Sequence, residues 1–258
     1  MEYFTTDGIK IAYQISGIGT GPKVVLIHGL FVNSDCWREQ LPDFEKEYQV
    51  LRMDLRGHGR STKPKKRFTI ADYASDLTKL LDSLGWTEDI SFVGHSLGGM
   101  VALAYAVQHP SNVRKMVIAS SYCFVSNEAV TDVLGRLNTA PLPKFALGIG
   151  KRGVIPYNEE TAQFIAKMVT EHMTKRDCMN ATVASAGINI CKNLRTLNIP
   201  TLLLVGRNDV ATPVWASEML HEWLPQSKLI VIPGAGHLII FEPAEVFNKH
   251  VKEFLTGS

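Results

Sequence analysis

The segment Gly94-His95-Ser96-Leu97-Gly98 holds a serine between two glycines, at the spacing that places a hydroxyl on a tight turn. The apolar run 90–93 precedes it and a stretch of small apolar residues follows, so a strand, a turn and a helix are expected in that order. The pattern predicts that Ser96 is a nucleophile, although a glycine-rich turn with an incidental serine would have the same sequence.

A serine hydroxyl needs a nearby base before it can attack a carbonyl carbon. His237 follows the last predicted strand, and Asp209 follows the strand predicted at 201–205. Carboxyl ends of parallel strands meet at one edge of a sheet, so both residues are expected beside Ser96. Taken alone, His237 fits a surface loop and Asp209 fits a turn. Together the three residues predict a Ser–His–Asp triad.

Acyl transfer also needs backbone N–H groups to stabilise an oxyanion. The Leu97 amide begins the predicted helix and is one candidate donor. The Leu30 amide is the second, because Gly29 lets the loop after the strand 23–27 bend close to the site. We assign His28 a structural role, which is to hold this loop by hydrogen bonds, and Phe31 the role of a pocket wall.

These residues need a sheet to position them. Residues 3–6 and 10–15 flank the turn signal Thr6-Asp7-Gly8 and predict a hairpin. Further strands are predicted for short runs rich in apolar residues, at 23–27, 49–53, 90–93, 115–119, 201–205 and 229–232. Helical patterns alternate with these runs, at 70–84, 97–108, 213–223 and 244–255. The alternation predicts a doubly wound, mostly parallel sheet. It stops between 122 and 193, where a helical insertion is expected, with one helical stretch predicted at 159–174.

The composition is that of an ordinary globular protein and favours no macromolecular partner. The chain has 258 residues, and its 27 basic and 25 acidic residues leave a net charge of +2, which favours neither nucleic acid nor an anionic membrane as a partner. No apolar run approaches the ~18 residues of a membrane span, and the first residues do not resemble an export signal, so a cytoplasmic location is expected. No metal or organic cofactor is expected, and the oligomeric state is left open.

Four cysteines are scattered without a C-x-x-C pair, at Cys36, Cys123, Cys178 and Cys191. They are predicted to be buried or partly exposed thiols. Neither a disulfide framework nor a zinc or iron–sulfur site is expected from their spacing.

The motifs together resemble those of the α/β-hydrolase superfamily, and the resemblance covers essentially the whole chain. The matching segments are His28-Gly29-Leu30, 54–61, 94–99, Gly206-Arg207-Asn208-Asp209 and Gly234-Ala235-Gly236-His237. The resemblance implies an eight-stranded, mostly parallel sheet, with residues 1–121 and 194–258 as the core and 122–193 as a helical cap. Ser96 distinguishes the chain from relatives with an aspartate nucleophile, and His95 distinguishes it from the C–C hydrolases, which usually have asparagine there.

Within this superfamily the chain resembles carboxylesterases and lipase-like enzymes. This implies hydrolysis of small to medium, largely apolar carboxylic esters through an acyl-enzyme intermediate. Lactonases, thioesterases and C–C bond hydrolases use the same triad and stay open as alternatives, as does a ligand receptor with slow turnover. The candidate substrate-binding side chains are Phe31, Phe124, Phe145 and Leu238.

Overall fold

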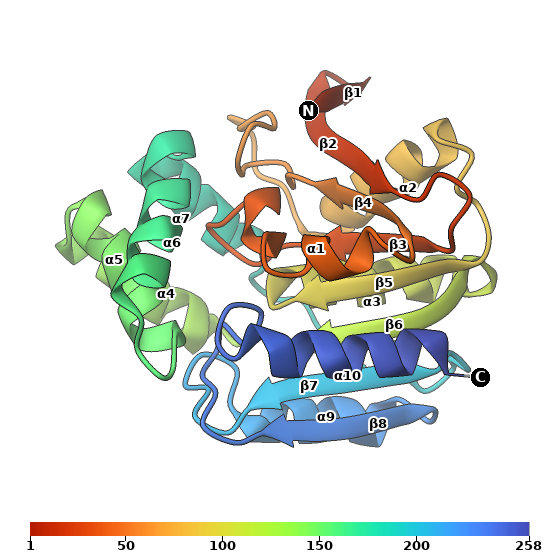
Figure 1. The fold of residues 1–258 in the computed structure, drawn as a ribbon. Helices are drawn as coiled ribbons and strands as arrows, with labels where there is room; N and C mark the ends of the chain where they lie inside the picture. The colour runs from red at the N-terminus through yellow and green to blue at the C-terminus, as the bar shows by residue number, and fades with distance from the viewer. Residues whose placement is uncertain (258) are drawn as a thin grey trace.

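The computed structural model describes residues 1–257, which contain one mixed sheet of eight strands (Figure 1). The strands lie in the order β1-β2-β4-β3-β5-β6-β7-β8. β1 pairs antiparallel with β2, and β2 with β4, whereas the other neighbouring pairs are parallel. The strands are β1 (Glu2–Thr6), β2 (Ile9–Gly17), β3 (Lys23–Ile27), β4 (Gln49–Met53), β5 (Ile90–His95), β6 (Val113–Ala119), β7 (Thr201–Gly206) and β8 (Ser227–Ile232). The predicted hairpin and mostly parallel sheet are confirmed.

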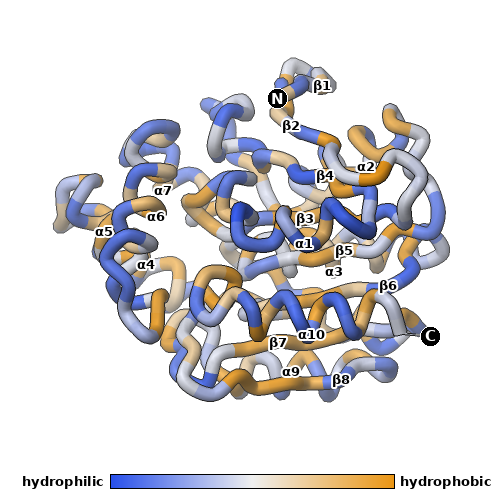
Figure 2. Tube along the Cα trace, in the orientation of Figure 1, coloured by the Kyte–Doolittle hydropathy of each residue, from blue (hydrophilic) through white to orange (hydrophobic). Residues whose placement is uncertain are grey.

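Helices cover both faces of the sheet. On β3, Val25 and Ile27 join the apolar core under one helical layer, while Val24 and Leu26 join the core under the other. Successive strand residues point to opposite faces, so a strand that is buried on both sides has a continuous apolar sequence. Figure 2 shows this pattern: β6, β7 and β8 are mostly hydrophobic, whereas α10 alternates between hydrophobic and hydrophilic residues.

The first face carries α2 (Ile70–Ser83), α3 (Leu97–Gln108) and α9 (Val214–Trp223). The second face carries α1 (Leu41–Phe44) and α10 (Ala244–Thr256). Three short helical turns complete the core elements, namely η1 (Ser34–Trp37), η2 (Pro110–Asn112) and α8 (Cys191–Leu194). All four helices predicted for the core are present, with ends within one residue of the predicted ranges.

A helical insert leaves the sheet after β6 and returns before β7, at the carboxyl ends of the strands (Figure 1). Its helices are α4 (Asn127–Thr139), α5 (Leu142–Gly153), α6 (Glu159–His172) and α7 (Lys175–Ala184). Ser126, Asn158 and Thr174 precede α4, α6 and α7, and each side chain accepts a hydrogen bond from a first-turn amide. Leu137 and other insert residues form an apolar cluster with Phe31, so the insert packs on the core at the loop after β3.

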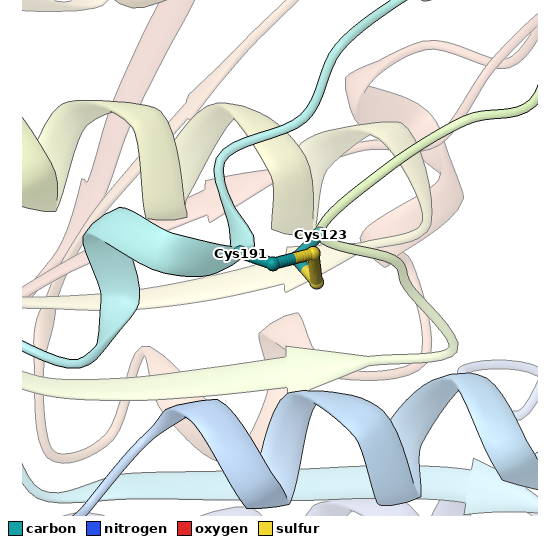
Figure 3. Close-up of a disulfide and its surroundings, with 2 residues drawn as sticks. All are labelled: Cys123 and Cys191. Carbon is teal, nitrogen blue, oxygen red and sulfur yellow. A yellow bond between two sulfur atoms is a disulfide. The ribbon is translucent and has the colours of Figure 1, made fainter.

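The prediction that all four cysteines are thiols is wrong for two of them. Cys123 and Cys191 form a disulfide between the loop after β6 and the start of α8 (Figure 3). The bond therefore joins the two segments that connect the insert to the core, and a hydrogen bond from Ile190 N to Cys123 O (2.9 Å) joins the same segments. A sequence separation of 68 positions conceals this pairing, because the two segments meet only once the sheet has formed. Cys36 and Cys178 are buried thiols, as predicted.

The disulfide also bears on the location of the protein. Structural disulfides are rare in the cytosol, so this bond weighs against the expected cytoplasmic location. Within residues 1–257, none of the helices has both the length and the apolar character needed to cross a membrane.

Candidate active site

Ser96 stands on the sharp turn between β5 and α3. Its backbone has φ 53° and ψ −116°, a conformation that residues other than glycine rarely adopt. The backbone around the turn is tightly packed: a Cβ at Gly94 would lie 2.5 Å from the Gly98 carbonyl oxygen, and a Cβ at Gly98 would overlap Ile27. Glycine is therefore required at both positions, which explains the spacing of the motif around Ser96.

Asp209 and His237 lie together at the same edge of the sheet. Asp209 follows β7, and its carboxylate accepts a hydrogen bond from His237 Nδ1 at 2.9 Å (Oδ2). The buried carboxylate also accepts hydrogen bonds from the Thr212 hydroxyl (2.6 Å) and from the Ala211 and Thr212 amides (2.8 Å each). Burial raises the pKa of Asp209, but the charge and hydrogen bond of His237 and the hydrogen bonds of Thr212 outweigh it and hold the pKa well below its usual value. The ionised carboxylate thus orients the His237 ring through Nδ1.

His95, next to Ser96 in the turn, supports the loop that carries His237. Its Nε2–H donates a hydrogen bond to the His237 carbonyl oxygen (2.9 Å), and the two ring centroids are 5.0 Å apart. Burial and the nearby His237 lower the pKa of His95 to about 3, so the ring is neutral and its proton is on Nε2. Sequence reasoning assigned His95 no contact, because the motif accepts any residue type at that position.

The loop after β3 passes directly beside Ser96. A Cβ at Gly29 would lie 3.3 Å from Ser96 Cβ and 2.9 Å from His95 Nδ1, so the backbone comes this close only with glycine there. Leu30 and Leu97 both line the cavity that contains Ser96. Leu97 is the first residue of α3, where backbone N–H groups have no acceptor within the helix, so its amide is available to a ligand.

His28 holds this loop by hydrogen bonds, as the sequence predicts. The ring is buried, Nδ1 donates to the Gly29 carbonyl oxygen (2.7 Å), and Nε2 accepts from the Leu55 amide (2.9 Å). Burial lowers the pKa of His28, which keeps the ring neutral. With both ring nitrogens engaged by the backbone, His28 is a structural residue of the loop.

The neighbouring loop 54–61 is organised by the buried carboxylate of Asp54. Oδ1 accepts hydrogen bonds from the Ser34 amide (2.8 Å) and hydroxyl (2.5 Å), and Oδ2 accepts one from the Arg60 amide (2.7 Å). Burial raises the pKa of Asp54, but the nearby His28 and the hydrogen bonds from Ser34 and Arg60 outweigh it and lower the pKa below its usual value. These contacts support the loop beside the site.

One cavity of about 310 Å³ between the core and the insert is lined by both Ser96 and His237. Three of the predicted substrate-binding side chains also line it, namely Phe31, Phe145 and Leu238. Phe124 lies outside the described lining and instead packs against Tyr122 and Trp215, with ring centroids 6.3 Å away in each case. Its aromatic character suggested a pocket residue, but the direction of its side chain depends on the path of the loop after β6.

Sequence reasoning missed other lining residues. They come from the insert and the loop after β7, and they include Tyr122, Arg136, Arg152 and Val210. Their positions depend on how the insert helices pack, which no local pattern reveals. Thr212 did have a signal, because Asp-x-x-Thr ahead of Pro213 is typical of a turn closed by side-chain hydrogen bonds. Within residues 1–257, the structure holds no cluster of three or more potential metal ligands.

Comparison with known families agrees with this geometry. The family model described as "alpha/beta hydrolase fold" matches residues 22–145, and the model described as "TAP-like protein" matches residues 162–258. The pimeloyl-[acyl-carrier protein] methyl ester esterase of Nitrosomonas europaea is 30% identical, over 87% of this chain and 92% of that protein. The chain belongs to the α/β-hydrolase fold family.

Solved structures resemble both the core and the insert. A thermophilic esterase from Thermogutta terrifontis is 28% identical with a TM-score of 0.87, over 98% of this chain and 96% of that one. Est816, described as an N-acyl homoserine lactone degrading enzyme, is 26% identical with a TM-score of 0.86, over 98% of this chain and 100% of that one. The protein is therefore a hydrolase of this family, and its structural neighbours include both an esterase and an enzyme that degrades an N-acyl homoserine lactone.

Proposed function

We propose that the protein is a serine hydrolase that cleaves carboxylic esters of small to medium, largely apolar substrates. One observation carries the proposal: His237, held at 2.9 Å by the buried carboxylate of Asp209, lines the same cavity as Ser96 on its strained turn. A histidine held in this way can accept the proton that a serine hydroxyl must lose before it attacks.

In the proposed reaction, the Ser96 oxygen attacks the ester carbonyl carbon while its proton passes to His237 Nε2. The Leu30 and Leu97 amides donate hydrogen bonds to the oxyanion that forms. The tetrahedral intermediate collapses, the C–O bond to the alcohol breaks, and His237 returns the proton to the leaving alkoxide. Water then attacks the acyl-enzyme with His237 as the base, and this step releases the carboxylic acid and restores the Ser96 hydroxyl. Asp209 stays ionised and stabilises the imidazolium throughout.

The expected substrate size follows from the cavity. A volume of about 310 Å³ is at the lower end of the range for small-molecule pockets, and aromatic and aliphatic side chains such as Phe31, Phe145 and Leu238 favour apolar acyl or alcohol groups. We also propose that residues 122–193 act as the cap, since α4 and α5 supply part of the lining.

The test is a series of p-nitrophenyl esters of increasing acyl length, assayed with the wild-type protein and with Ser96→Ala. We expect a defined optimum of kcat/KM at a short or medium chain, and a loss of about three or more powers of ten in the variant. Near-native turnover by Ser96→Ala would overturn the proposal. A flat and very slow profile for the wild type would favour a ligand receptor instead.

A second candidate is the hydrolysis of lactones, which are cyclic esters. The similarity to Est816 over nearly the whole of both chains supports it. The same cavity and serine chemistry would serve, with the leaving alkoxide still attached to the acyl group. The ratio of kcat/KM for a lactone to that for its open-chain methyl ester separates the two candidates.

A further inference from the structure

The cavity beside Ser96 is apolar over most of its lining but has charged side chains on the insert. Among the described residues that line it, Asp132 and Arg136 of α4 and Arg152 of α5 have a formal charge. Two positive groups and one negative group leave an excess of one positive charge. The Arg136 side chain is 40% exposed and that of Asp132 67%, and Arg152 is exposed as well, so water reaches all three charges. An apolar ester would offer this positive charge no partner.

Asp132 forms an ion pair with only one of these two arginines. Its Oδ2 lies 2.8 Å from Arg136 Nη2, which forms an ion pair along α4. The Nε atom of Arg136 is buried and has no hydrogen-bond partner among the described residues. Burial and the positive charge of Arg136 lower the pKa of Arg152, although Asp132 opposes the shift. A buried donor of Arg136 thus still lacks an acceptor.

A structural explanation covers only part of this arrangement. Arg136 and Arg152 occupy the last turns of α4 and α5, where a positive side chain also interacts favourably with the carboxyl end of a helix. Lys151 lies in the same last turn of α5 and is not among the residues that line the cavity. Stabilisation of the helix end thus requires no arginine at the cavity. Phe145, Ile149 and Arg152 all line it, at the spacing of four and three that places residues on one face of a helix.

We propose that Arg136 and Arg152 form a subsite for an anionic group, most simply a carboxylate, on an otherwise apolar ester substrate. The inference rests on the proposed ester hydrolysis at Ser96 and specifies its substrate class. Guanidinium groups bind carboxylates through paired, charge-assisted hydrogen bonds, and the Arg136 Nε donor would gain an acceptor. Because Ser96 belongs to the core and both arginines belong to the insert, the bound substrate spans the interface between them.

The test compares charged and neutral esters of matched length. Monoethyl glutarate and monoethyl suberate place the carboxylate on the acyl side, and ethyl pentanoate and ethyl octanoate are their neutral counterparts. The acetate ester of γ-hydroxybutyrate places the carboxylate on the alcohol side, with butyl acetate as its counterpart. We expect kcat/KM to favour the charged ester by about tenfold or more in at least one pair, and the preference to weaken between about 20 and about 500 mM NaCl.

Variants at the two arginines locate the effect. Arg136→Met and Arg152→Met keep the side-chain length and remove the charge, and each is expected to reduce the charged-to-neutral ratio about tenfold. Arg152→Lys keeps the positive charge but loses the paired hydrogen bonds, so it should retain only part of the ratio, between those of the wild type and Arg152→Met. The matched control Lys151→Met should leave the ratio unchanged. Each variant is judged by the ratio of kcat/KM for the charged ester to kcat/KM for the neutral one. A general loss of activity or of folded protein lowers both values and leaves this ratio unchanged. An unchanged ratio in both arginine variants, or no charge preference in the wild type, would overturn the subsite.

A binding measurement separates this inference from the proposed function. The N-ethyl amides of glutaric and pentanoic acid resist cleavage far better than the esters, so their affinities for the wild-type protein can be measured by calorimetry without turnover. Tighter binding of the charged amide, lost in Arg152→Met, supports the subsite even if ester hydrolysis is not found. Equal affinities of the two amides would overturn the subsite and leave the hydrolase proposal standing.

Discussion

Replacing Asp209 by asparagine tests how the His237 ring is oriented. The two carboxylate oxygens have different partners apart from His237: Oδ1 accepts hydrogen bonds from the Ala211 and Thr212 amides at 2.8 Å each, and Oδ2 accepts one from the Thr212 hydroxyl at 2.6 Å. His237 Nδ1 lies 2.9 Å from Oδ2 and 3.1 Å from Oδ1, so Oδ2 is its nearer partner. In Asp209→Asn, the two amides require the amide oxygen at the Oδ1 position. The NH2 group is then forced into the Oδ2 position, facing His237.

This orientation reverses the hydrogen bond to the histidine. The asparagine NH2 donates to His237 Nδ1, so the ring proton moves to Nε2, the nitrogen that must accept the proton of Ser96. A serine triad with this wrong tautomer loses about 10⁴-fold in kcat, which corresponds to about 5 kcal/mol of transition-state stabilisation. We expect a loss of this size for Asp209→Asn with the p-nitrophenyl ester that the wild type cleaves best.

A matched control separates orientation from general damage. Thr212→Val removes one hydrogen bond to Asp209 but leaves the His237–Asp209 contact, so we expect a loss of about tenfold or less. Circular dichroism and the urea midpoint of each variant report whether the fold is kept. If folded Asp209→Asn kept more than about a tenth of the wild-type kcat, the inferred role of Asp209 would be refuted.

Three further predictions concern stability and support of the site. Removing the disulfide in a Cys123→Ser, Cys191→Ser double variant should lower the free energy of unfolding by up to about 4 kcal/mol for a loop of 68 positions; urea unfolding with and without reductant measures it, and a wild type insensitive to reductant would contradict it. His95→Leu leaves the His237 carbonyl without its donor and should reduce kcat about tenfold or more, whereas His95→Gln, which retains a donor, should recover part of the loss. The pKa values of His28, His95, Asp54 and Asp209 all lie below their usual values in the folded protein, so the unfolded chain takes up protons first. Stability should therefore fall as the pH drops below about 6, because of the histidines, and fall further below about 4, because of the carboxylates; a constant urea midpoint between about pH 7 and pH 3 would argue against this.

The core could be predicted from the sequence because the local hydrophobic pattern of each core strand matches its burial in the fold. The predicted ranges of β3 and β4 match the observed ones, since strands buried on both faces leave continuous apolar runs that end where polar residues begin. The predicted neighbours of Ser96 also lie together, because residues at the carboxyl ends of parallel strands share one edge of the sheet whatever the loops between them do.

The insert could not be predicted to the same depth. Of its helices only α6 was indicated by a residue range, and the expected end at 174 lies two residues beyond the observed end at His172. Whether Phe124 faces the cavity depends on the path of the loop after β6, and whether Arg136 does depends on how the insert helices pack on one another. Amphipathic spacing identifies the apolar face of a helix but not the element that packs against it. The Cys123–Cys191 disulfide could not be predicted for a related reason. The two segments that connect the insert to the core come together only through the topology of the fold, which no local pattern reveals.

Covalent labelling tests the central claim about Ser96 most directly. An alkyl phosphonate with a p-nitrophenol leaving group reacts with an activated serine, releases p-nitrophenol and leaves the phosphonyl group attached to the nucleophile. We predict one phosphonyl group per chain, mapped by peptide mass spectrometry to Ser96, and no labelling of Ser96→Ala. Labelling at another residue, or equal labelling of the wild type and the variant, would contradict the assignment of Ser96 as the nucleophile.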